Sequence, residues 1–161
     1  MTGIHVRRMT AADVRPLRAA VLRPTAPIEK SIYPGDDDLS TFHAAAFDEN
    51  GTLMSVGTVI QQPPLNNTDA AALRATGAEF TPENAWRLRG MASLEEARGK
   101  GFGKAALLAC IDYVRAQGGA IIWCYAREEA VGFYLRLGYV AASEPHPSPD
   151  HGDQVLMWVK V

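Results

Sequence analysis

The hydrophobic pattern along the chain changes its period several times, which predicts an alternation of strands and helices. Period-two or continuous apolar runs predict strands at residues 4–7, 41–47, 52–60, 85–93, 120–125 and 154–161, with another strand beginning at 139. Apolar residues three and four apart predict helices after residue 10, from 102 to a Gly-Gly pair at 118, and from about 128 to 137, with a shorter helix near 70–75. This order predicts an α/β protein with a mixed sheet and helices on its faces, in a single domain over residues 1–161.

Turn and capping signals support several of these boundaries. Thr10 and Asp13 have the spacing of a capping box at a helix start. An Asn-Gly pair at residues 50–51 lies between two predicted strands and favours a hairpin. Gly90 interrupts a predicted strand, where a glycine indicates a bulge or the close approach of a ligand to the backbone. The polar segment 61–84 is too long for a simple sheet connection, so it is expected to be either mobile or a cover over a site.

Composition narrows the classes of function. Of the 161 residues, 47% are hydrophobic and 21% are charged, as in ordinary soluble globular proteins. The formal net charge of -2 argues against a general nucleic-acid binder. The absence of a long apolar run and of a signal-peptide core leads us to expect no membrane association and a cytoplasmic location. The two cysteines, Cys110 and Cys124, are expected to be buried thiols rather than a disulfide or a metal site.

The segment Arg-Gly-Lys-Gly-Phe-Gly-Lys at residues 98–104 carries the strongest chemical signal in the chain, because it joins a predicted strand to a predicted helix. Glycine permits a close approach between backbone and ligand, and a helix start presents unpaired N–H groups and a positive dipole end. Arg98, Lys100 and Lys104 add positive charge. The segment is predicted to hold a pyrophosphate, although a basic turn that only connects two elements would have the same composition.

Other phosphate-binding motifs fit this segment less well. Its glycines follow G-x-G-x-G, whereas dinucleotide folds use G-x-G-x-x-G with an acidic residue at the ribose-binding distance. A Walker motif requires serine or threonine after its lysine, and Lys104 is followed by Ala105. A nucleotide-phosphate binder of either kind is therefore disfavoured.

Two stretches resemble the GNAT acetyltransferase superfamily. Residues 88–108, with the pattern R-G-x-G-x-G, are similar to that family's fourth strand, pyrophosphate loop and third helix. Residues 126–140 are similar to its closing helix, which ends in an aromatic-tyrosine pair followed, a few residues later, by Gly-Phe or Gly-Tyr. The resemblance implies a central, twisted, mixed sheet of seven strands, splayed at strands four and five. It also implies acetyl-coenzyme A as co-substrate and no metal.

The resemblance assigns expected roles to individual residues. The pantetheine arm would lie along the strand backbone at Met91, Ala92 and Ser93. The diphosphate would be held by the glycine loop, which comprises Arg98, Gly99, Lys100, Gly101, Phe102, Gly103 and Lys104. Tyr134 would hydrogen-bond or protonate the departing thiolate, although its helical spacing alone favours a core aromatic. Many members carry asparagine seven residues earlier. Arg127 stands there instead, and it is expected to contact coenzyme phosphate or the acceptor.

Acidic and histidine side chains supply the first candidates for the acceptor site. Asp36, Asp37 and Asp38 follow a Pro-Gly turn and either attract a cationic acceptor or form a capped, solvated turn. His43 lies on a predicted strand as a candidate base, but a lone histidine beside alanines favours a structural role.

Arginines supply the remaining candidates. Arg89 alternates with Arg87 on one strand face, so one of them either lines the acceptor groove or snorkels at its edge. Arg23 either binds an acceptor carboxylate or is an ordinary surface arginine, and the second alternative is favoured.

These features predict an N-acetyltransferase that moves an acetyl group from acetyl-coenzyme A to a primary amine of a small molecule by direct attack. The alternative is a non-catalytic acetyl-coenzyme A binder that senses or regulates. Both need the glycine loop, but only the enzyme needs Tyr134 and an open acceptor cleft. The acceptor and the general base stay open, and a homodimer is one oligomeric state that the sequence allows.

Overall fold

A computed structural model describes residues 3–149 and 151–161 of the chain. The chain folds into two compact units. The first unit comprises the residues up to Ile60 together with Leu88–Tyr113, and the second comprises Gln61–Arg87 and Val114–Val161. The strand β4 (Ala85–Ser93) runs through the boundary, so each unit contains part of it.

Seven strands form a mixed sheet, as the family resemblance implied, and their order in the sheet is β1-β2-β3-β4-β5-β7-β6. Their bounds are His5–Met9 (β1), Phe42–Phe47 (β2), Leu53–Gln61 (β3), Ala85–Ser93 (β4), Ile121–Arg127 (β5), Val140–Ala141 (β6) and Gln154–Lys160 (β7). β4 and β5 are parallel, whereas β1 with β2, β2 with β3, β5 with β7 and β6 with β7 are antiparallel. All expected strands are present, with ends shifted by no more than one or two residues.

The α-helices in the described residues are Ala11–Leu22 (α1), Asn67–Ala75 (α2), Phe102–Ala116 (α3) and Val131–Arg136 (α4). The predicted capping box forms at α1, where Thr10 Oγ1 accepts from the Asp13 N–H and Asp13 Oδ2 accepts from the Thr10 N–H. α4 is shorter than expected because Glu128–Ala130 forms a 3-10 turn. None of the helices in this described part is long and apolar enough to cross a membrane.

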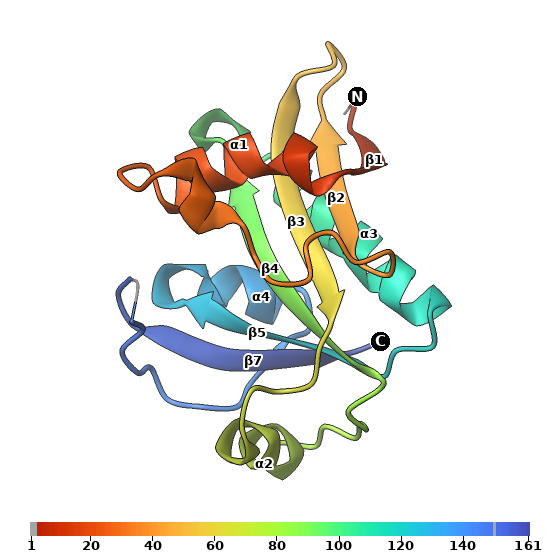
Figure 1. Cartoon of the computed structure of the whole chain (residues 1–161), viewed down its shortest axis with the longest axis vertical. Helices are drawn as coiled ribbons and strands as arrows, with labels where there is room; N and C mark the ends of the chain where they lie inside the picture. Colours follow the sequence, from red (N-terminus) through yellow and green to blue (C-terminus); the bar gives the residue numbers. More distant parts are fainter. Residues whose placement is uncertain (1–2, 150) are drawn as a thin grey trace. The chain divides into compact units, whose positions relative to one another are not determined.

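In the first unit, α1 and α3 cover opposite faces of the strands (Figure 1). Val14 and Leu17 of α1 pack against a small core patch that contains Ala45, Val56 and Ala92. Successive strand residues point to opposite faces, so Gly57, next to Val56, faces the other side. A Cβ at Gly57 would lie 3.8 Å from the sulfur of Cys110 on α3. The alternation of the strands therefore separates the surface that holds α1 from the surface that holds α3.

In the second unit, the polar segment 61–84 is packed onto the sheet. Leu73 of α2 lies in a core with two tryptophans of the strands, Trp123 and Trp158. The Trp123 indole N–H donates to the Gln62 carbonyl at 2.8 Å, and the Trp158 indole N–H donates to Thr76 Oγ1 at 2.9 Å. The segment is therefore held on the sheet by hydrogen bonds and by apolar packing, and a cover over a site stays a prediction.

The pairing of β4 is consistent with the predicted splay. The parallel ladder runs from the pair Ala85 and Ile121 to the pair Arg87 and Trp123. Beyond this ladder β4 continues to Ser93, while β5 continues in register with β7.

Both cysteines are free and buried, as predicted. Burial raises the pKa of each thiol, Cys110 and Cys124, to about 12, so neither is reactive at neutral pH. In the described part of the chain, no group of three or more His, Cys, Asp or Glu side chains is arranged to hold a metal ion.

Candidate active site

The predicted pyrophosphate loop is a tight turn that leads into α3. Gly99 and Gly101 have φ angles of +75° and +91°, a region that other residues rarely adopt. The Lys100 N–H donates to the Ala97 carbonyl at 3.3 Å, and the Ala105 N–H donates to the Gly101 carbonyl at 3.0 Å. The backbone thus turns twice through left-handed conformations before the first helical hydrogen bond forms, which explains two of the three glycines.

The surroundings of this loop fit a bulky anionic group. A Cβ at Gly99 would meet no other atom within 4 Å. Arg98, Lys100 and Lys104 are exposed. The first N–H groups of α3 have no carbonyl partner within their own helix, and they lie at the positive end of the helix dipole. These residues fit the diphosphate of a coenzyme A molecule.

The three residues expected beside the pantetheine arm complete β4. Ala92 is buried in the core against α1, whereas Met91 and Ser93 are partly exposed. Ser55 Oγ donates to the Ala92 carbonyl at 3.2 Å and lies 2.7 Å from Ser93 Oγ, so Ser93 donates to Ser55. The Met91 side chain fills the space that a side chain at Gly57 would occupy. The end of β4 is therefore firmly held to β3.

Tyr134 and Arg127 both lie in the second unit. Tyr134 is buried on α4, and its ring centroid lies 5.2 Å from that of Phe133 and 5.1 Å from that of Tyr139. Arg127 is the last residue of β5, opposite Gln154 of β7. The Tyr134 ring has the packing of a core aromatic, so any chemical role must belong to its hydroxyl.

Comparison with known proteins identifies the family. A sequence model described as the acetyltransferase (GNAT) family matches residues 12–139. The chain belongs to the GNAT acetyltransferase family. It is 30% identical over 156 residues to the uncharacterized N-acetyltransferase YitI of Bacillus subtilis (strain 168), and the match covers 96% of this chain and 95% of YitI.

Solved GNAT structures share the fold. A GCN5-related N-acetyltransferase from Kribbella flavida aligns with a TM-score of 0.67 and 18% identity, over 99% of this chain and 98% of that chain. An aminoglycoside 6'-N-acetyltransferase complexed with coenzyme A aligns with a TM-score of 0.67 and 13% identity, over 97% and 96% of the two chains. The predicted fold and enzyme class are confirmed: the protein is an acetyltransferase of a family that uses acetyl-coenzyme A.

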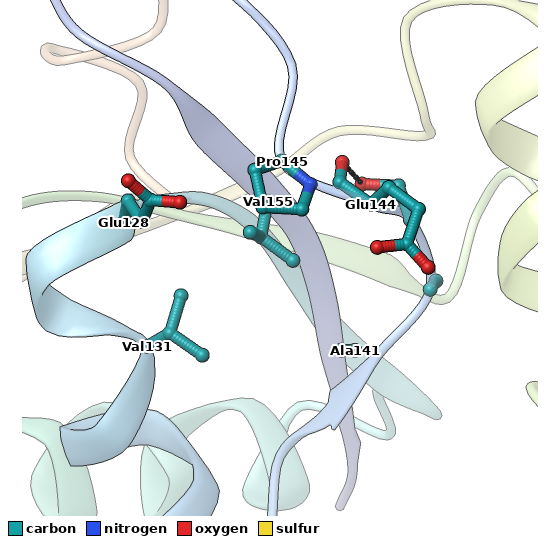
Figure 2. A pocket seen from close by; sticks show the side chains of 8 residues that line it. Glu128, Val131, Ala141, Glu144, Pro145 and Val155 are labelled. Atoms are coloured by element: carbon teal, nitrogen blue, oxygen red, sulfur yellow. Dashed lines mark hydrogen bonds between the residues drawn. The ribbon is translucent and has the colours of Figure 1, made fainter.

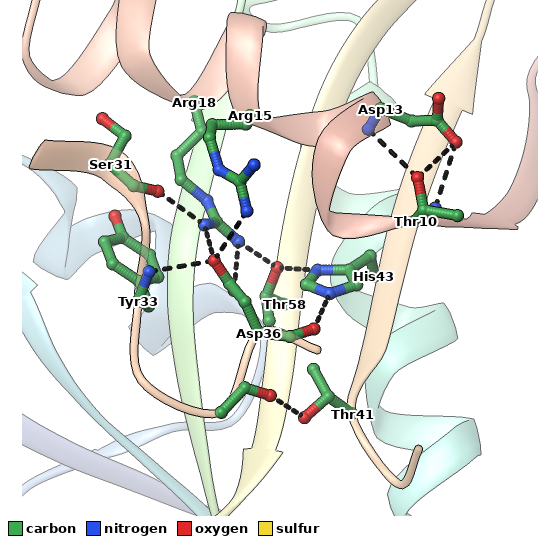
Figure 3. A network of polar contacts seen from close by, with 11 residues as sticks. Thr10, Asp13, Arg15, Arg18, Ser31, Tyr33, Asp36, Thr41, His43 and Thr58 are labelled. Carbon is green, nitrogen blue, oxygen red and sulfur yellow. Dashed lines mark hydrogen bonds and ion pairs between the residues drawn. The ribbon is translucent and has the colours of Figure 1, made fainter. Parts of the chain in front are cut away.

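A buried ion pair lies in the first unit, within a network of polar contacts (Figure 3). Arg18 Nη1 and Nη2 donate to the two carboxylate oxygens of Asp36 at 2.8 and 3.2 Å. The Tyr33 N–H donates to the same carboxylate at 2.9 Å, and Arg15 Nη2 lies 3.5 Å from it. Burial raises the pKa of Asp36, but the hydrogen bonds from Arg18 and Tyr33 outweigh it, and the pKa lies below its usual value.

This ion pair corrects the interpretation of the acidic turn. Asp37 and Asp38 are exposed, as expected for a solvated turn, but Asp36 is only 4% exposed. The expectation of a solvated turn is therefore wrong for Asp36. Because its carboxylate is committed to Arg18, only Asp37 and Asp38 are left to attract a cationic acceptor.

His43 belongs to the same network. It is buried, its Nε2 lies 2.8 Å from the Asp36 carbonyl, and its Nδ1 lies 2.7 Å from Thr58 Oγ1. A carbonyl only accepts, so Nε2 carries the proton and Nδ1 accepts from the Thr58 hydroxyl. Thr58 in turn accepts from Arg18 Nη2 at 2.8 Å. Burial lowers the pKa of His43, against the effect of the Asp36 carbonyl, and the neutral ring fits this chain of donors.

The close approach predicted at Gly90 is made by the protein itself. Gly90 has a φ of +64°, and a Cβ there would lie 2.7 Å from Arg18 Nε and 3.2 Å from Tyr33 Cε2. Next to it, the Arg89 guanidinium carbon lies 4.0 Å from the centroid of the Tyr33 ring. The guanidinium carbon of Arg18 lies 4.1 Å from the same centroid. Tyr33 is thus contacted by two arginines, one from α1 and one from β4.

Four residues of this network were not predicted from the sequence: Arg15, Arg18, Tyr33 and Thr58. Arg18 could have been found because it continues the apolar stripe of α1 four residues after Val14. Thr58 could have been found from the hairpin, whose register places it opposite His43.

The second unit has a separate open pocket of about 720 Å³ (Figure 2). It is lined by Glu128, Val131, Ala141, Ala142, Ser143, Glu144, Pro145 and Val155. The figure shows the two glutamate side chains on either side of the apolar Pro145 and Val155. None of the predicted site residues lines this pocket.

Proposed function

We propose that this GNAT acetyltransferase moves an acetyl group from acetyl-coenzyme A to a primary amine of a small molecule, by direct attack of the amine on the thioester. The observation that carries the proposal is the exposed basic loop with left-handed Gly99 and Gly101 at the start of α3, in a chain of this family. We also propose that residues 1–161 act as one catalytic domain.

The loop residues would bind the coenzyme. Backbone N–H groups between Gly99 and Lys104 would hold the diphosphate, because the first N–H groups of α3 lack a partner within the helix and lie at the positive end of its dipole. The Lys100 N–H, which donates to the Ala97 carbonyl, would have to exchange that bond to take part. The exposed side chains of Arg98 and Lys104 would add charge-assisted hydrogen bonds. Arg127, at the end of β5, is a further candidate for a coenzyme phosphate.

Residues of β4 would orient the reacting group. The backbone from Met91 to Ser93 would pair with the pantetheine arm, and its position is held by the hydrogen bonds of Ser55. An N–H in this stretch would stabilise the negative charge that develops on the carbonyl oxygen. Holding both reactants in place lowers the barrier further by removing their translational freedom.

Proton transfer requires an acid and a base. The Tyr134 hydroxyl would donate to the departing thiolate. His43 is a poor base for the ammonium proton, since Nδ1 already accepts from Thr58 and Nε2 donates to Asp36. The base is therefore assigned to another group or to a water, and an amine that arrives neutral needs none to begin its attack.

Release of free thiol from acetyl-coenzyme A over a panel of amines tests this function. Turnover of at least one primary amine, with mass-spectrometric detection of the amide product, is the expected result. A matched panel of alcohols controls for O-acetylation. Tight coenzyme binding by calorimetry without turnover of any amine would contradict the proposal and favour the sensor.

A further inference from the structure

The surroundings of Tyr33 hold more positive than negative charge. Arg18 and Arg89 both lie against the ring, and Arg15 lies beside the carboxylate of Asp36. Asp36 is the one acidic side chain in direct contact with this group among the described residues, and it is bonded by both Nη atoms of Arg18. The negative charge of Asp36 therefore offsets the positive charge of one arginine, and the other two arginines leave the group with a net positive charge.

Arg89 is the arginine whose polar atoms are uncommitted. Within residues 3–149 and 151–161 the guanidinium of Arg89 makes no hydrogen bond or ion pair. It stacks on the ring of Tyr33. Burial lowers the pKa of Arg89, and the charges of Arg18 and Arg23 act in the same direction, against the opposing effects of Tyr33 and Asp36. Arg89 is half-buried, so part of its side chain is exposed to solvent. Five N–H donors in a planar fork suit a carboxylate or a phosphate.

The position of Arg89 on β4 connects it to the proposed chemistry. Two residues of chain span at most about 7 Å between Cα atoms, so Arg89 lies within that distance of Met91. Gly90 between them is fixed by its contact with Arg18, and Tyr33 supports the flat side of the Arg89 guanidinium. A guanidinium stacked in this way keeps its edge, which carries the donors, for a ligand.

We propose that the acceptor amine of this acetyltransferase also carries an oxyanion, a carboxylate or a phosphate, and that Arg89, supported by Tyr33, binds it. The inference rests on the proposed function and narrows its substrate class. Of the acidic turn, Asp36 no longer counts toward the attraction of a cationic acceptor, which was one of the two alternatives expected, because it is committed to Arg18. The anion fixes one end of the acceptor, and the amine is left to reach the thioester beside Met91.

Matched pairs of amines test this selection. 4-Aminobutanoate is compared with butylamine, phenylalanine with phenethylamine, and O-phosphoethanolamine with ethanolamine, so that carboxylate and phosphate are tested separately. Each compound is assayed for thiol release, and each acid-bearing compound is also titrated by calorimetry into protein saturated with coenzyme A. The variants are Arg89→Gln, which removes the charge, and Arg89→Lys, which keeps the charge without the fork.

Arg74→Gln is the matched control. Arg74 also stacks on an aromatic ring, with its guanidinium carbon 4.1 Å from the centroid of Phe80, but it lies on α2. Circular dichroism and coenzyme affinity establish that all three variants are folded. The control therefore separates the loss of a stacked arginine in general from the loss of Arg89.

In the wild type, the acid-bearing member of at least one pair should have the lower KM and should bind in calorimetry. Arg89→Gln should raise that KM and the dissociation constant by roughly ten- to a hundred-fold, as expected for charge-assisted hydrogen bonds. The KM of the plain amine should change little, Arg89→Lys should recover part of the loss, and Arg74→Gln should behave as the wild type.

Three outcomes overturn the inference, and they are distinct from failure of the proposed function. In the first, the plain amines are acetylated as efficiently as their acid-bearing partners. In the second, the preference for the acid-bearing partner persists in Arg89→Gln. Either result would show that Arg89 does not select the acceptor, while the proposed acetyl transfer would still hold. The absence of calorimetric binding for every acid-bearing compound would also overturn the inference. Conversely, Arg89-dependent binding without turnover of any amine would support the anion site and contradict the acetyltransferase proposal.

Discussion

The side chain of Arg18 occupies the space that a side chain at Gly90 would need: a Cβ at Gly90 would lie 2.7 Å from Arg18 Nε. Arg18 is fully buried and is held in place by Asp36, Thr58 and the Ser31 carbonyl. It cannot move aside without breaking these bonds. The glycine in β4 is therefore required by a contact inside the first unit.

Gly90→Ala should destabilise the protein for two reasons, the positive φ and the contact with Arg18. Gly51→Ala is the matched control, because Gly51 has a φ of +81° and open space around its Cβ position. We expect Gly90→Ala to cost about 1–3 kcal/mol more than Gly51→Ala, the range for overpacking. Urea denaturation followed by circular dichroism measures both. Equal losses in the two variants would show that Arg18 yields easily.

Asp36→Asn should be among the most destabilising conservative changes in the chain. It leaves the buried charge of Arg18 without its counter-ion, and breaking a buried pair in this way costs about 3–5 kcal/mol. Asp38→Asn changes an exposed carboxylate two residues away and should alter the free energy of unfolding by less than about 0.5 kcal/mol. The two urea midpoints give the comparison. A mild effect of Asp36→Asn would mean that water reaches Arg18.

The stability of the protein should decrease as the pH falls below about 6.5, the usual pKa of a histidine in an unfolded chain. Burial lowers the pKa of His43 in the folded state, so the unfolded state binds more protons between the two pKa values. The contribution of His43 is therefore complete above the unfolded pKa and is lost as the pH falls through that window. Asp36, whose pKa is lowered from 3.8, contributes a similar loss only at more acidic pH.

His43→Gln should flatten the dependence of stability on pH. His5→Gln, which changes an exposed histidine, should leave that dependence as it is in the wild type. Urea midpoints measured between about pH 7.5 and about pH 5 supply the slopes, which report the difference in bound protons. A slope that persists in His43→Gln would assign the titration to another group.

Gly101→Val should weaken the binding of acetyl-coenzyme A by about ten- to a hundred-fold, because a branched side chain prevents close approach to the backbone N–H groups. Gly118→Val controls for backbone strain, since Gly118 has a φ of +80° at the other end of α3. Calorimetry on the folded variants is the measurement. Wild-type affinity in Gly101→Val would exclude the loop as the diphosphate site.

Tyr134→Phe should fold normally, because the ring retains its packing against Phe133 and Tyr139. If the hydroxyl protonates the thiolate, kcat and kcat/KM should fall together by roughly a hundred- to ten-thousand-fold. The fall would be smaller if product release limits the wild type, so single-turnover kinetics are the decisive measurement. Full single-turnover chemistry in the variant would leave Tyr134 as a packing residue.

The order of the elements and most of their bounds could be predicted because local signals decide them. The capping box of Thr10 and the Asn-Gly hairpin at residues 50–51 act within a few residues, and the structure has both. The glycine loop was also predictable, since a left-handed backbone conformation at Gly99 or Gly101 limits the choice of residue.

The network around Arg18 and Asp36 could not be predicted in the same way, because it depends on contacts between distant segments. Asp36, Asp37 and Asp38 are equivalent in sequence, and only the approach of Arg18, 18 residues earlier, makes one of them buried. Gly90 indicated a close approach, but nothing local to β4 says that the approaching group is an arginine of α1. The charge balance that singles out Arg89 exists only after these segments fold together.

The placement of the tryptophans determines what intrinsic fluorescence can report. All three, Trp86, Trp123 and Trp158, belong to the second unit. Emission excited at wavelengths that only indole absorbs therefore follows the unfolding of that unit, whereas Gly90, Asp36 and His43 lie in the other. A denaturation curve recorded by fluorescence that coincides with one recorded by circular dichroism would mean that the two units unfold as one cooperative body. Two separated curves would give each unit its own free energy of unfolding, with no label added to the protein.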